Sequence, residues 1–451
     1  MHVVFLTSRF LPHSMGGGET HTYHLARALA ARGHDVEILL AGDPPDPAAR
    51  SYEFEGLRVT CCPADSDTRF HDSSYAAQAG SWLRKFHADH PIDVMHVMVS
   101  GLCKGMMRAA VELRIRLVIT LLDFHNWCPT ALLRPNQQMC AGPESVRECQ
   151  RCVLMPFARL SRLQPAWSRF PKSVRRALLA LGPASLSPLE SIWDDFEGRQ
   201  RLFHDKLASY ATFIAPSPIM RRLAEENGVP AHCIVDMAYG VPGSFLGAGR
   251  PKTPSDVLRV GFLGRLVHEK GVHVLVAAVR KLPADVRLQL VLHGAGSPDT
   301  PEYLRNVHAM AAGDPRIEFR AVIPQHEVAR AHREFDVLAI PSLWHENATI
   351  ALLESLALGT PAVVSDVEGM APFVQNGENG FRVPPGDSAA FAQKLAWCAA
   401  HLQEVRDMSA RCRPVITIDR QAQDVEATYR HVLEPRRAPA ASAGDGAMAV
   451  V

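Results

Sequence analysis

The stretch that decides the fold covers residues 341–361 and reads PSLWHENATIALLESLALGTP. Strand-like runs precede it at 336–340 and follow it at 362–365. Between them the sequence predicts a helix with Asn347 as its N-cap and Gly359 as its C-terminal stop, and the final proline prevents continuation. A strand, a helix and a second strand in this order predict an α/β fold with a mostly parallel sheet.

Two glutamates belong to this predicted helix and its mouth. Glu346 is placed beside free backbone amides and the positive end of the helix dipole. Glu354 follows two turns later on an apolar face, where an unpaired charge is costly and a ligand hydroxyl would satisfy it. At about 100° per residue the two carboxylates are turned by roughly 80°, so both can border one cleft at the carboxyl end of a strand. Taken singly, each is an ordinary helix-terminal or solvated glutamate.

The spacing of these glutamates carries a resemblance to a known family. Glu346, seven intervening residues and Glu354, with LALGTPAVVSD at 356–366, resemble the signature of family-4 retaining glycosyltransferases. The lead-in WHEN at 344–347 resembles bacterial members that build surface polysaccharides. The resemblance implies the GT-B architecture, in which two Rossmann-like domains face each other across a cleft, and a donor that is a nucleotide-activated sugar.

Length and composition fit two soluble domains. A chain of 451 residues suits two cores of about 200 residues each. The net charge of +1 gives no argument for nucleic-acid binding, and no apolar run reaches the roughly 18 to 20 residues of a membrane-spanning helix. The N-terminus lacks the basic segment and cleavage site of a secretory signal, so we expect a cytoplasmic protein whose ten cysteines are reduced thiols or metal ligands.

Apolar runs, glycines and prolines predict the domain boundaries. Residues 1–245 form the predicted N-terminal, acceptor-side Rossmann-like domain, with an insertion at about 128–205. A linker rich in Gly and Pro leads to the predicted nucleotide-sugar-binding Rossmann-like domain at 257–418. A C-terminal helix at 419–435 is expected to cross back to the first domain, and 436–451 to be a disordered tail.

A glycine-rich turn follows the first predicted strand. Gly17 and Gly18 open a helix at a position where backbone amides can approach a phosphate or a sugar. Taken alone, these glycines are more simply a tight turn. The resemblance implies that this loop faces the cleft and contacts the donor or the acceptor.

The loop after the strand at 257–263 is the candidate phosphate site. Arg265 and Lys270 lie between the carboxyl end of that strand and the start of a helix, and two cations with free amides suit a diphosphate. Taken alone, they are more simply solvated charges. The resemblance implies that Gly264, Arg265 and Lys270 grip the phosphates of the donor and neutralise the departing diphosphate.

The resemblance implies further donor contacts. Glu346 would hold sugar hydroxyls near the anomeric carbon, and Glu354 would hold the ribose. Two turns would border the nucleobase and ribose, partly through main-chain groups that do not distinguish UDP from GDP; their residues are His293, Gly294, Val322 and Ile323. The amides at the helix mouth would add dipole stabilisation from Asn347, Ala348 and Thr349.

Two departures from the family pattern bear on activity. Residues 120–123 read TLLD where similar members carry TLHD, so Leu122 stands in place of a cleft histidine. Leucine neither donates a hydrogen bond nor takes a proton, which makes His125, three residues on, the remaining candidate for a catalytic histidine. Residues 368–372 read EGMAP where relatives tend to have GGMAE.

These residues favour one function over two others. The favoured function is a hexosyltransferase with retention of configuration, using Glu346, Arg265, Lys270 and His125. The alternative is a GT-B nucleotide-binding protein with impaired or lost transfer, because of Leu122. A nicotinamide-dependent dehydrogenase is disfavoured, because the first glycine turn lacks the spacing of a dinucleotide fingerprint.

Four cysteines fall in or beside the predicted insertion: Cys128, Cys140, Cys149 and Cys152. Four thiolates can hold a structural zinc ion tetrahedrally, but the gaps of eleven and eight residues are irregular, and ordinary thiols explain them as well. No cofactor is implied for catalysis, since GT-B enzymes generally stabilise the diphosphate with side chains and a helix dipole.

Residues 159–176 combine arginines and a lysine with leucines and aromatic residues. This composition suits an anionic membrane surface, and therefore a glycan or lipid-linked acceptor at the inner membrane face. Pro165 and Pro171 are expected to interrupt any long helix, and a solvated basic loop is the competing interpretation.

Overall fold

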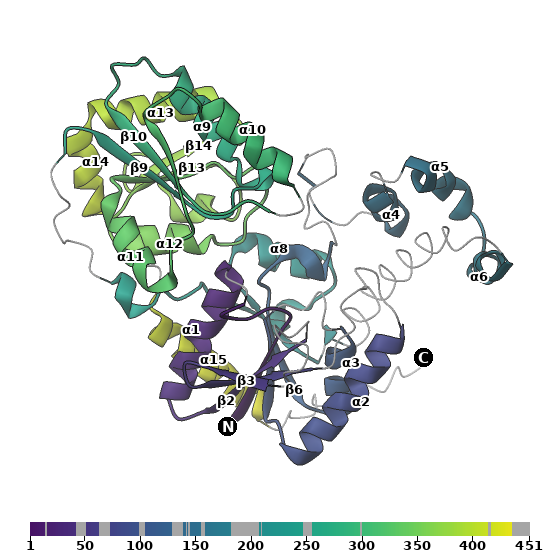
Figure 1. The fold of residues 1–451 in the computed structure, drawn as a ribbon. Helices are drawn as coiled ribbons and strands as arrows, with labels where there is room; N and C mark the ends of the chain where they lie inside the picture. Colours follow the sequence, from purple (N-terminus) through teal and green to yellow (C-terminus); the bar gives the residue numbers. More distant parts are fainter. Residues whose placement is uncertain are drawn as a thin grey trace, which may run out of the picture.

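Two α/β bodies lie side by side in the computed structural model (Figure 1). The structure describes residues 1–13, 16–41, 51–62, 73–98, 104–128, 139–140, 142, 145–154, 158–181, 207–208, 210–246, 255–297, 300–413 and 416–434. Most of the predicted linker, the predicted tail at 436–451 and parts of the insertion at 128–205 lie outside these residues. Among the described residues, no helix has both the length and the apolar character needed to cross a membrane.

The first body contains an eight-stranded sheet that is parallel except for one edge. Among the described strands of this sheet, only β3 runs antiparallel to its neighbour β4. Phe5 at the centre of β1 pairs with Ile38 of β2 and His96 of β5. In spatial order the strands are β3 (Ser51–Phe54), β4 (Leu57–Cys61), β2 (Asp35–Leu40), β1 (His2–Thr7), β5 (Val94–Val97), β6 (Arg116–Thr120), β7 (Thr212–Ala215) and β8 (Ile234–Asp236).

The second body contains a six-stranded sheet that is parallel throughout. In spatial order its strands are β11 (Ile317–Arg320), β10 (Leu288–His293), β9 (Leu258–Leu263), β12 (Val337–Ile340), β13 (Ala362–Ser365) and β14 (Gly380–Val383). The strands on either side of the 341–361 stretch therefore lie next to each other, as predicted. Two mainly parallel sheets confirm the predicted α/β class.

The described helices either pack against the sheets or, in the predicted insertion, lie apart from them (Figure 1). They are α1 (Gly17–Ala31), α2 (Ser73–Asp89), α3 (Lys104–Glu112), α4 (Val146–Leu154), α5 (Ala158–Trp167), α6 (Lys172–Leu181), α8 (Pro218–Glu226), α9 (Val272–Lys281), α10 (Pro301–Ala311), α11 (Gln325–Glu334), α12 (Ile350–Ala357), α13 (Ser388–Ala400), α14 (Leu402–Ser409) and α15 (Ile418–Leu433). The expectation that Pro165 interrupts a helix is wrong, because it lies inside α5. The chain instead breaks before Pro171, between α5 and α6.

The C-terminal helix α15 packs on the first sheet and not on the second. Val425 and Tyr429 are fully buried in the same apolar cluster as Phe5 of β1. Arg32, at the end of α1, donates from Nε to Glu426 Oε2 at 2.7 Å. The described part of the chain therefore begins and ends in the same body, and the second sheet is built from the segment between.

A buried histidine fixes α15 to the sheet. His96 Nδ1 lies 2.6 Å from the Tyr429 hydroxyl, and His96 Nε2 lies 2.7 Å from Thr120 Oγ1. Nearby, the ring of His21 stacks at a tilt on Tyr239, 4.5 Å between centroids. Burial lowers the pKa of His96 to about 3 and that of His21 to about 3, so both are neutral in the folded protein.

We expect these two histidines to make the protein acid-sensitive. In the unfolded chain these two side chains take up protons near pH 6.5, whereas in the folded chain they do not. The stability that they contribute is therefore fully present above that pH and is lost as the pH falls. Between about pH 5.5 and 4, each histidine lowers the free energy of unfolding by about 1.4 kcal/mol per pH unit. Urea unfolding at several pH values measures this slope, and His96→Phe should reduce it.

His326, whose side chain is 81% exposed, supplies the matched control. His326→Gln should keep the wild-type slope. An unchanged slope in His96→Phe would show that the acid sensitivity arises elsewhere.

Candidate functional site

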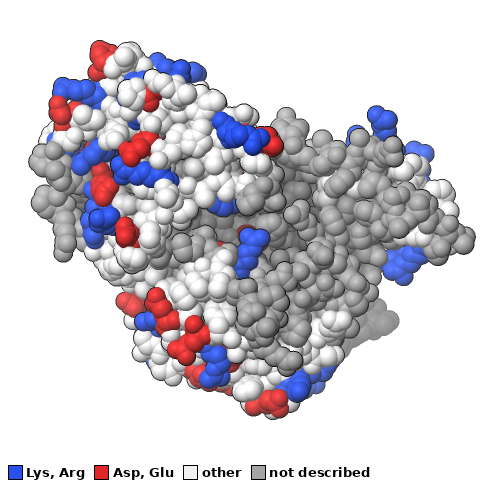
Figure 2. Space-filling view, in the orientation of Figure 1, with Lys and Arg blue, Asp and Glu red and all other residues white. Residues whose placement is uncertain are grey.

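Loops of the second body meet at the carboxyl ends of β9, β10 and β12. Leu266, after β9, donates its amide to Ala295 O, after β10, at 2.8 Å. Leu343, after β12, donates its amide to Glu269 O, also at 2.8 Å. Ligands of open α/β sheets bind at this edge. Figure 2 shows the surface hollowed between the two bodies.

Two glycines allow these loops to touch. A Cβ on Gly294 would lie 1.9 Å from Gly264 O. Gly271 has a φ of 67°, and a Cβ there would lie 1.9 Å from Pro341 O. Any side chain at either position would force the backbones apart. The two glycines thus hold the loops of the predicted phosphate site together.

Lys270 and Glu346 form a buried ion pair at this junction. Lys270 Nζ donates to Glu346 Oε1 at 2.7 Å, and the two side chains are 17% and 5% exposed. Ser342 Oγ donates to the same carboxylate oxygen, and Lys270 Nζ lies 5.1 Å from the centre of the Trp344 ring. Burial raises the pKa of Glu346, but the charge and hydrogen bond of Lys270 outweigh it, so the pKa lies below its ordinary value. Two predicted site residues, distant in sequence, are therefore in direct contact.

The helix after Glu346 begins later than predicted. Asn347 is not its N-cap, because α12 starts at Ile350 and Thr349 precedes it without a side-chain cap. Glu346 and Ala348 have positive φ values of 41° and 45°. This uncommon backbone turns the segment away from a helical path before α12 starts.

Asn347 instead joins the two bodies. Its side-chain Nδ2 donates to Leu121 O at 2.7 Å and to Leu122 O at 2.9 Å. Tyr239 OH lies 3.1 Å from the same nitrogen, and Ser217 Oγ donates to Asn347 Oδ1 at 2.7 Å. The residue after Glu346 is thus held by the first body.

Glu354 lies beside a buried histidine. It is 5% exposed, and its Oε2 lies 3.5 Å from Nε2 of the fully buried His332 on α11, but among the described residues neither ring nitrogen of His332 makes a hydrogen bond. The sequence suggested that a ligand hydroxyl would satisfy Glu354, and this stays a prediction. His332 could not be identified as a neighbour from the sequence because it lies on another helix.

Several predicted donor-binding groups remain available at the same edge. The Arg265 side chain is 60% exposed and lies 3.5 Å from Glu269. Val322 is 51% exposed. Within the described residues, Thr349 Oγ1 and His293 Nε2 are buried without a hydrogen-bond partner. Such atoms are costly unless a bound molecule or water satisfies them.

The glycine turn of the first body reaches the start of α12. A Cβ on Gly17 would lie 3.3 Å from Ile350 Cδ1, and one on Gly18 would lie 3.8 Å from Leu122 Cδ1. Leu122 is half-buried against an apolar cluster that includes Leu353 of the second body. Leucine at this position therefore packs between the bodies, and its side chain supports their contact.

His125 lies on the short turn Phe124–Asn126 and is exposed. Its Nδ1 is 3.4 Å from Asp123 Oδ1, and the same oxygen accepts from the His125 amide. Phe124 of this turn meets the Trp344 ring edge-on, 6.2 Å between centroids. The turn thus adjoins the Lys270 pair through Phe124 and Trp344.

The four cysteines are not assembled as a metal site. Among the residues that the structure describes, which include Cys128, Cys140, Cys149 and Cys152, no group of three His, Cys, Asp or Glu side chains is placed to hold a metal ion. Cys140 Sγ donates to Gly142 O at 3.1 Å. A zinc ion here remains a prediction that lacks support from the geometry.

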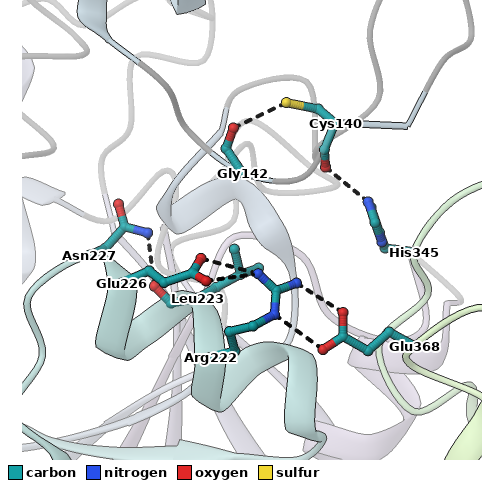
Figure 3. Close-up of polar contacts among 8 residues, drawn as sticks. All are labelled: Cys140, Gly142, Arg222, Leu223, Glu226, Asn227, His345 and Glu368. Carbon is teal, nitrogen blue, oxygen red and sulfur yellow. Dashed lines mark hydrogen bonds and ion pairs between the residues drawn. The ribbon is translucent and has the colours of Figure 1, made fainter.

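A second set of contacts spans the two bodies and could not be predicted from the sequence (Figure 3). Arg222 of α8 donates to both oxygens of Glu368, at 3.2 and 2.9 Å. His345, beside Glu346, lies 2.9 Å from Cys140 O in the insertion. Glu368 is one of the positions where the chain departs from the family pattern, so the departure supplies a bridge between the bodies.

Comparison with known proteins identifies the family. The family described as "Glycosyl transferase 4-like domain" matches residues 16–160, and "Glycosyl transferases group 1" matches residues 258–401. Together the two matches cover both bodies and most of the described chain. The chain belongs to the family-4 glycosyltransferases.

Named relatives match parts of this glycosyltransferase. A D-inositol 3-phosphate glycosyltransferase of Corynebacterium efficiens is 34% identical over 170 residues, which are 36% of this chain and 40% of the relative. A phosphatidyl-myo-inositol mannosyltransferase of Mycobacterium leprae is 32% identical over 212 residues, 44% of this chain and 52% of the relative. The matches to these curated relatives thus span only about half of their length.

Solved structures confirm the GT-B fold. HepE of Anabaena, crystallised with UDP and glucose, superposes with a TM-score of 0.65 at 16% identity, covering 95% of this chain and 99% of that one. WaaG, a glycosyltransferase involved in lipopolysaccharide biosynthesis, gives 0.63 at 14% identity, covering 95% and 99%. The predicted two-domain architecture is therefore confirmed.

We expect the Arg222–Glu368 pair to set the separation of the two domains. Both side chains are more than one-third exposed, so the pair should add only about 0.2–1 kcal/mol to the free energy of unfolding. Glu368→Ala should nevertheless increase the radius of gyration in small-angle scattering at low salt, because the bridge is lost. High salt screens the ion pair, so the radius of gyration of the wild-type protein should then approach that of the variant.

Arg221 is the matched control, because it pairs with Asp236 and Glu225 of its own domain. Arg221→Ala should leave the radius of gyration unchanged. Equal radii for all three proteins would contradict a role of the bridge in domain separation.

Proposed function

We propose that this protein transfers a hexosyl group from a nucleotide-diphosphate sugar to a hydroxyl of a glycan or lipid-linked acceptor, with retention of configuration. The observation that carries the proposal is the buried contact of Lys270 with Glu346, next to the exposed Arg265, at the sheet edge where α/β folds bind ligands. The contact joins a cation suited to phosphate with a carboxylate suited to sugar hydroxyls.

In this proposal the cations stabilise the leaving group. Negative charge grows on the diphosphate as the glycosidic bond breaks, and preorganised positive groups lower the barrier most where charge develops. Arg265 is free to swing onto the phosphates, being mostly exposed. Lys270 is already fixed by Glu346, so it needs little reorganisation to offer its remaining donors.

The carboxylates take the hydroxyl-binding roles. Oε2 of Glu346 does not accept from Lys270 or Ser342, and in this proposal it would accept from a sugar hydroxyl. Glu354 is backed by His332 and would hold the ribose. Same-face attack by the acceptor hydroxyl would follow with no protein nucleophile.

The named relatives support the choice of acceptor. The Mycobacterium leprae relative is named for mannosyl transfer involving phosphatidyl-myo-inositol, a lipid. A lipid-linked acceptor therefore fits this chain. UDP-sugars are the first donors to test, because the HepE structure of the same fold holds UDP and glucose.

Arg265→Ala should weaken UDP or GDP binding by about 10- to 100-fold, because one charge-assisted hydrogen bond to phosphate is lost. Lys270→Ala should do the same and should also lower the melting temperature, since it leaves Glu346 buried without its cation. Titration calorimetry with the diphosphate and the monophosphate of the same base measures the loss of affinity. Scanning calorimetry measures the melting temperature. The loss of affinity should be larger for the diphosphate.

Lys281→Ala is the control, because Lys281 lies at the far end of α9 and bonds to Ser388 Oγ. It should bind as the wild type does. Equal losses for diphosphate and monophosphate would place Arg265 and Lys270 away from the outer phosphate.

The alternative function is a nucleotide-binding protein that has lost transfer. The packing of Leu122 between the domains favours it, since the residue closes a position where similar members have a histidine. The two functions are separated by binding calorimetry with UDP and GDP, followed by a turnover assay with UDP- and GDP-sugars. Turnover that persists with EDTA supports the transferase, in which side chains supply the positive charge. Binding without donor hydrolysis or transfer supports the alternative.

A further inference from the structure

Helices α4, α5 and α6 form an arm that lies apart from both sheets (Figure 1). The arm has internal packing of its own. Leu154 and Trp167 are 0% and 7% exposed, and the buried Gln164 donates to Gln150 Oε1 at 3.1 Å. Arg175 is 3% exposed and donates to Phe170 O at 3.1 Å, which fixes the turn between α5 and α6. The orientation of the exposed side chains is thus set by folded structure.

An apolar row runs along the outside of this arm. Phe170, Val174 and Leu178 are 44%, 40% and 41% exposed, and their spacing of four places them on one face of α6 and the turn before it. Leu163 on α5 is 48% exposed. Of the eight large apolar side chains that are exposed in the described chain, these four fall within sixteen residues. A soluble surface rarely gathers them so closely.

The charges beside this row have one sign. Residues 158–181 contain six basic residues and no acidic one. Arg162, Arg169 and Arg176 are exposed, on or next to the two helices that carry the row. In Figure 2 the charged side chains visible on the arm, at the right of the view, are blue, the colour of Lys and Arg. Among the described residues, the α5–α6 part of the arm therefore combines exposed apolar side chains with basic side chains only, whereas the exposed Glu148 lies on α4.

We propose that the α5–α6 face of the arm lies on an anionic lipid bilayer. Phe170, Val174 and Leu178 enter the boundary between headgroups and acyl chains, and the exposed arginines contact lipid phosphates. The inference deepens the proposed function and rests on it for the acceptor, which would be delivered from the same bilayer. The membrane contact itself can be tested without turnover.

The insertion also connects this face to the cleft. Cys140, in the same insertion, accepts a hydrogen bond from His345 at 2.9 Å, and His345 is next to Glu346 in the chain. Binding of the arm to a membrane would therefore bring the chain segment that contacts His345 close to the surface. A lipid-linked acceptor would reach the cleft without leaving the bilayer.

The charge pattern argues against another occupant of this face. A symmetric pairing of two copies would bring the arms' positive borders together, which like-charge repulsion opposes. Nucleic acid would use the arginines but would leave the apolar row exposed to water. An anionic bilayer satisfies both kinds of side chain.

The test uses the full chain and two kinds of vesicle, one of phosphatidylcholine alone and one rich in phosphatidylglycerol. Sedimentation should recover the protein with the anionic vesicles and not with the neutral ones, and high salt should weaken binding. Replacing Arg162, Arg169 and Arg176 together by Gln should lower the affinity by about 100-fold. Phe170→Ser with Val174→Ser and Leu178→Ser should also release the protein.

The matched control changes two equally exposed apolar residues outside the arm, Leu246→Ser and Met310→Ser, which are 39% and 38% exposed. This variant should bind the vesicles as the wild type does. Both arm variants should keep the wild-type melting temperature and the wild-type shift with UDP or GDP, which shows that they are folded.

Failure of the two proposals can be told apart. Equal recovery with neutral and anionic vesicles, or undiminished binding of the arm variants, would overturn the membrane contact while leaving nucleotide binding intact. A concentration-dependent dimer that the apolar variant abolishes, without vesicle binding, would assign the face to a second copy. Vesicle binding by a protein that no nucleotide stabilises would keep the membrane contact and overturn the transferase.

Discussion

The site depends on the contact between Lys270 and Glu346. Taking a cation and a carboxylate out of water is costly, and only good geometry with further hydrogen bonds offsets the cost. Here Ser342 supplies a further bond, and the two loops that carry the charges are already joined through backbone contact. The pair is therefore held in place before a donor arrives, and the charge that a phosphate would meet is preorganised.

The same contact explains the unusual backbone near Glu346. The positive φ values of Glu346 and Ala348 let the Glu346 carboxylate face Lys270 while Asn347 turns to the first domain. Backbone strain of this kind costs about 1–3 kcal/mol per residue and persists only where surrounding contacts hold the residue in that conformation. The Lys270 ion pair and the Asn347 hydrogen bonds are those contacts.

Most of the fold could be predicted from the sequence, because its signals are local. Apolar runs placed β9, β12 and β13 to within a residue or so, and Gly359, with a φ of 74°, ends α12 as expected. The contacts across the chain could not be predicted in this way. Neither the His332 partner of Glu354 nor the Glu368 partner of Arg222 has a local pattern, since each pair forms only after distant helices and loops have packed.

The misplaced N-cap has the same physical origin. Asparagine is a good N-cap when the helix is considered alone, because its side chain can accept from a free amide. In the folded chain the carbonyls of Leu121 and Leu122 offer the Asn347 amide nitrogen two acceptors, and Ser217 offers the oxygen a donor. Hydrogen bonds to residues distant in the sequence therefore replace the local N-cap hydrogen bond.

Asn347 also couples the position of the domains to the chemistry of the cleft. It follows Glu346 directly, so a displacement of the first domain moves the peptide that carries the carboxylate. For the same reason, a ligand that forms new hydrogen bonds with Lys270 or Glu346 would alter the geometry of the Asn347 hydrogen bonds. A bound ligand can shift a domain equilibrium only by its differential interaction with the two arrangements. The short path from Lys270 through Glu346 to Asn347 joins the ion pair to the contacts between the domains.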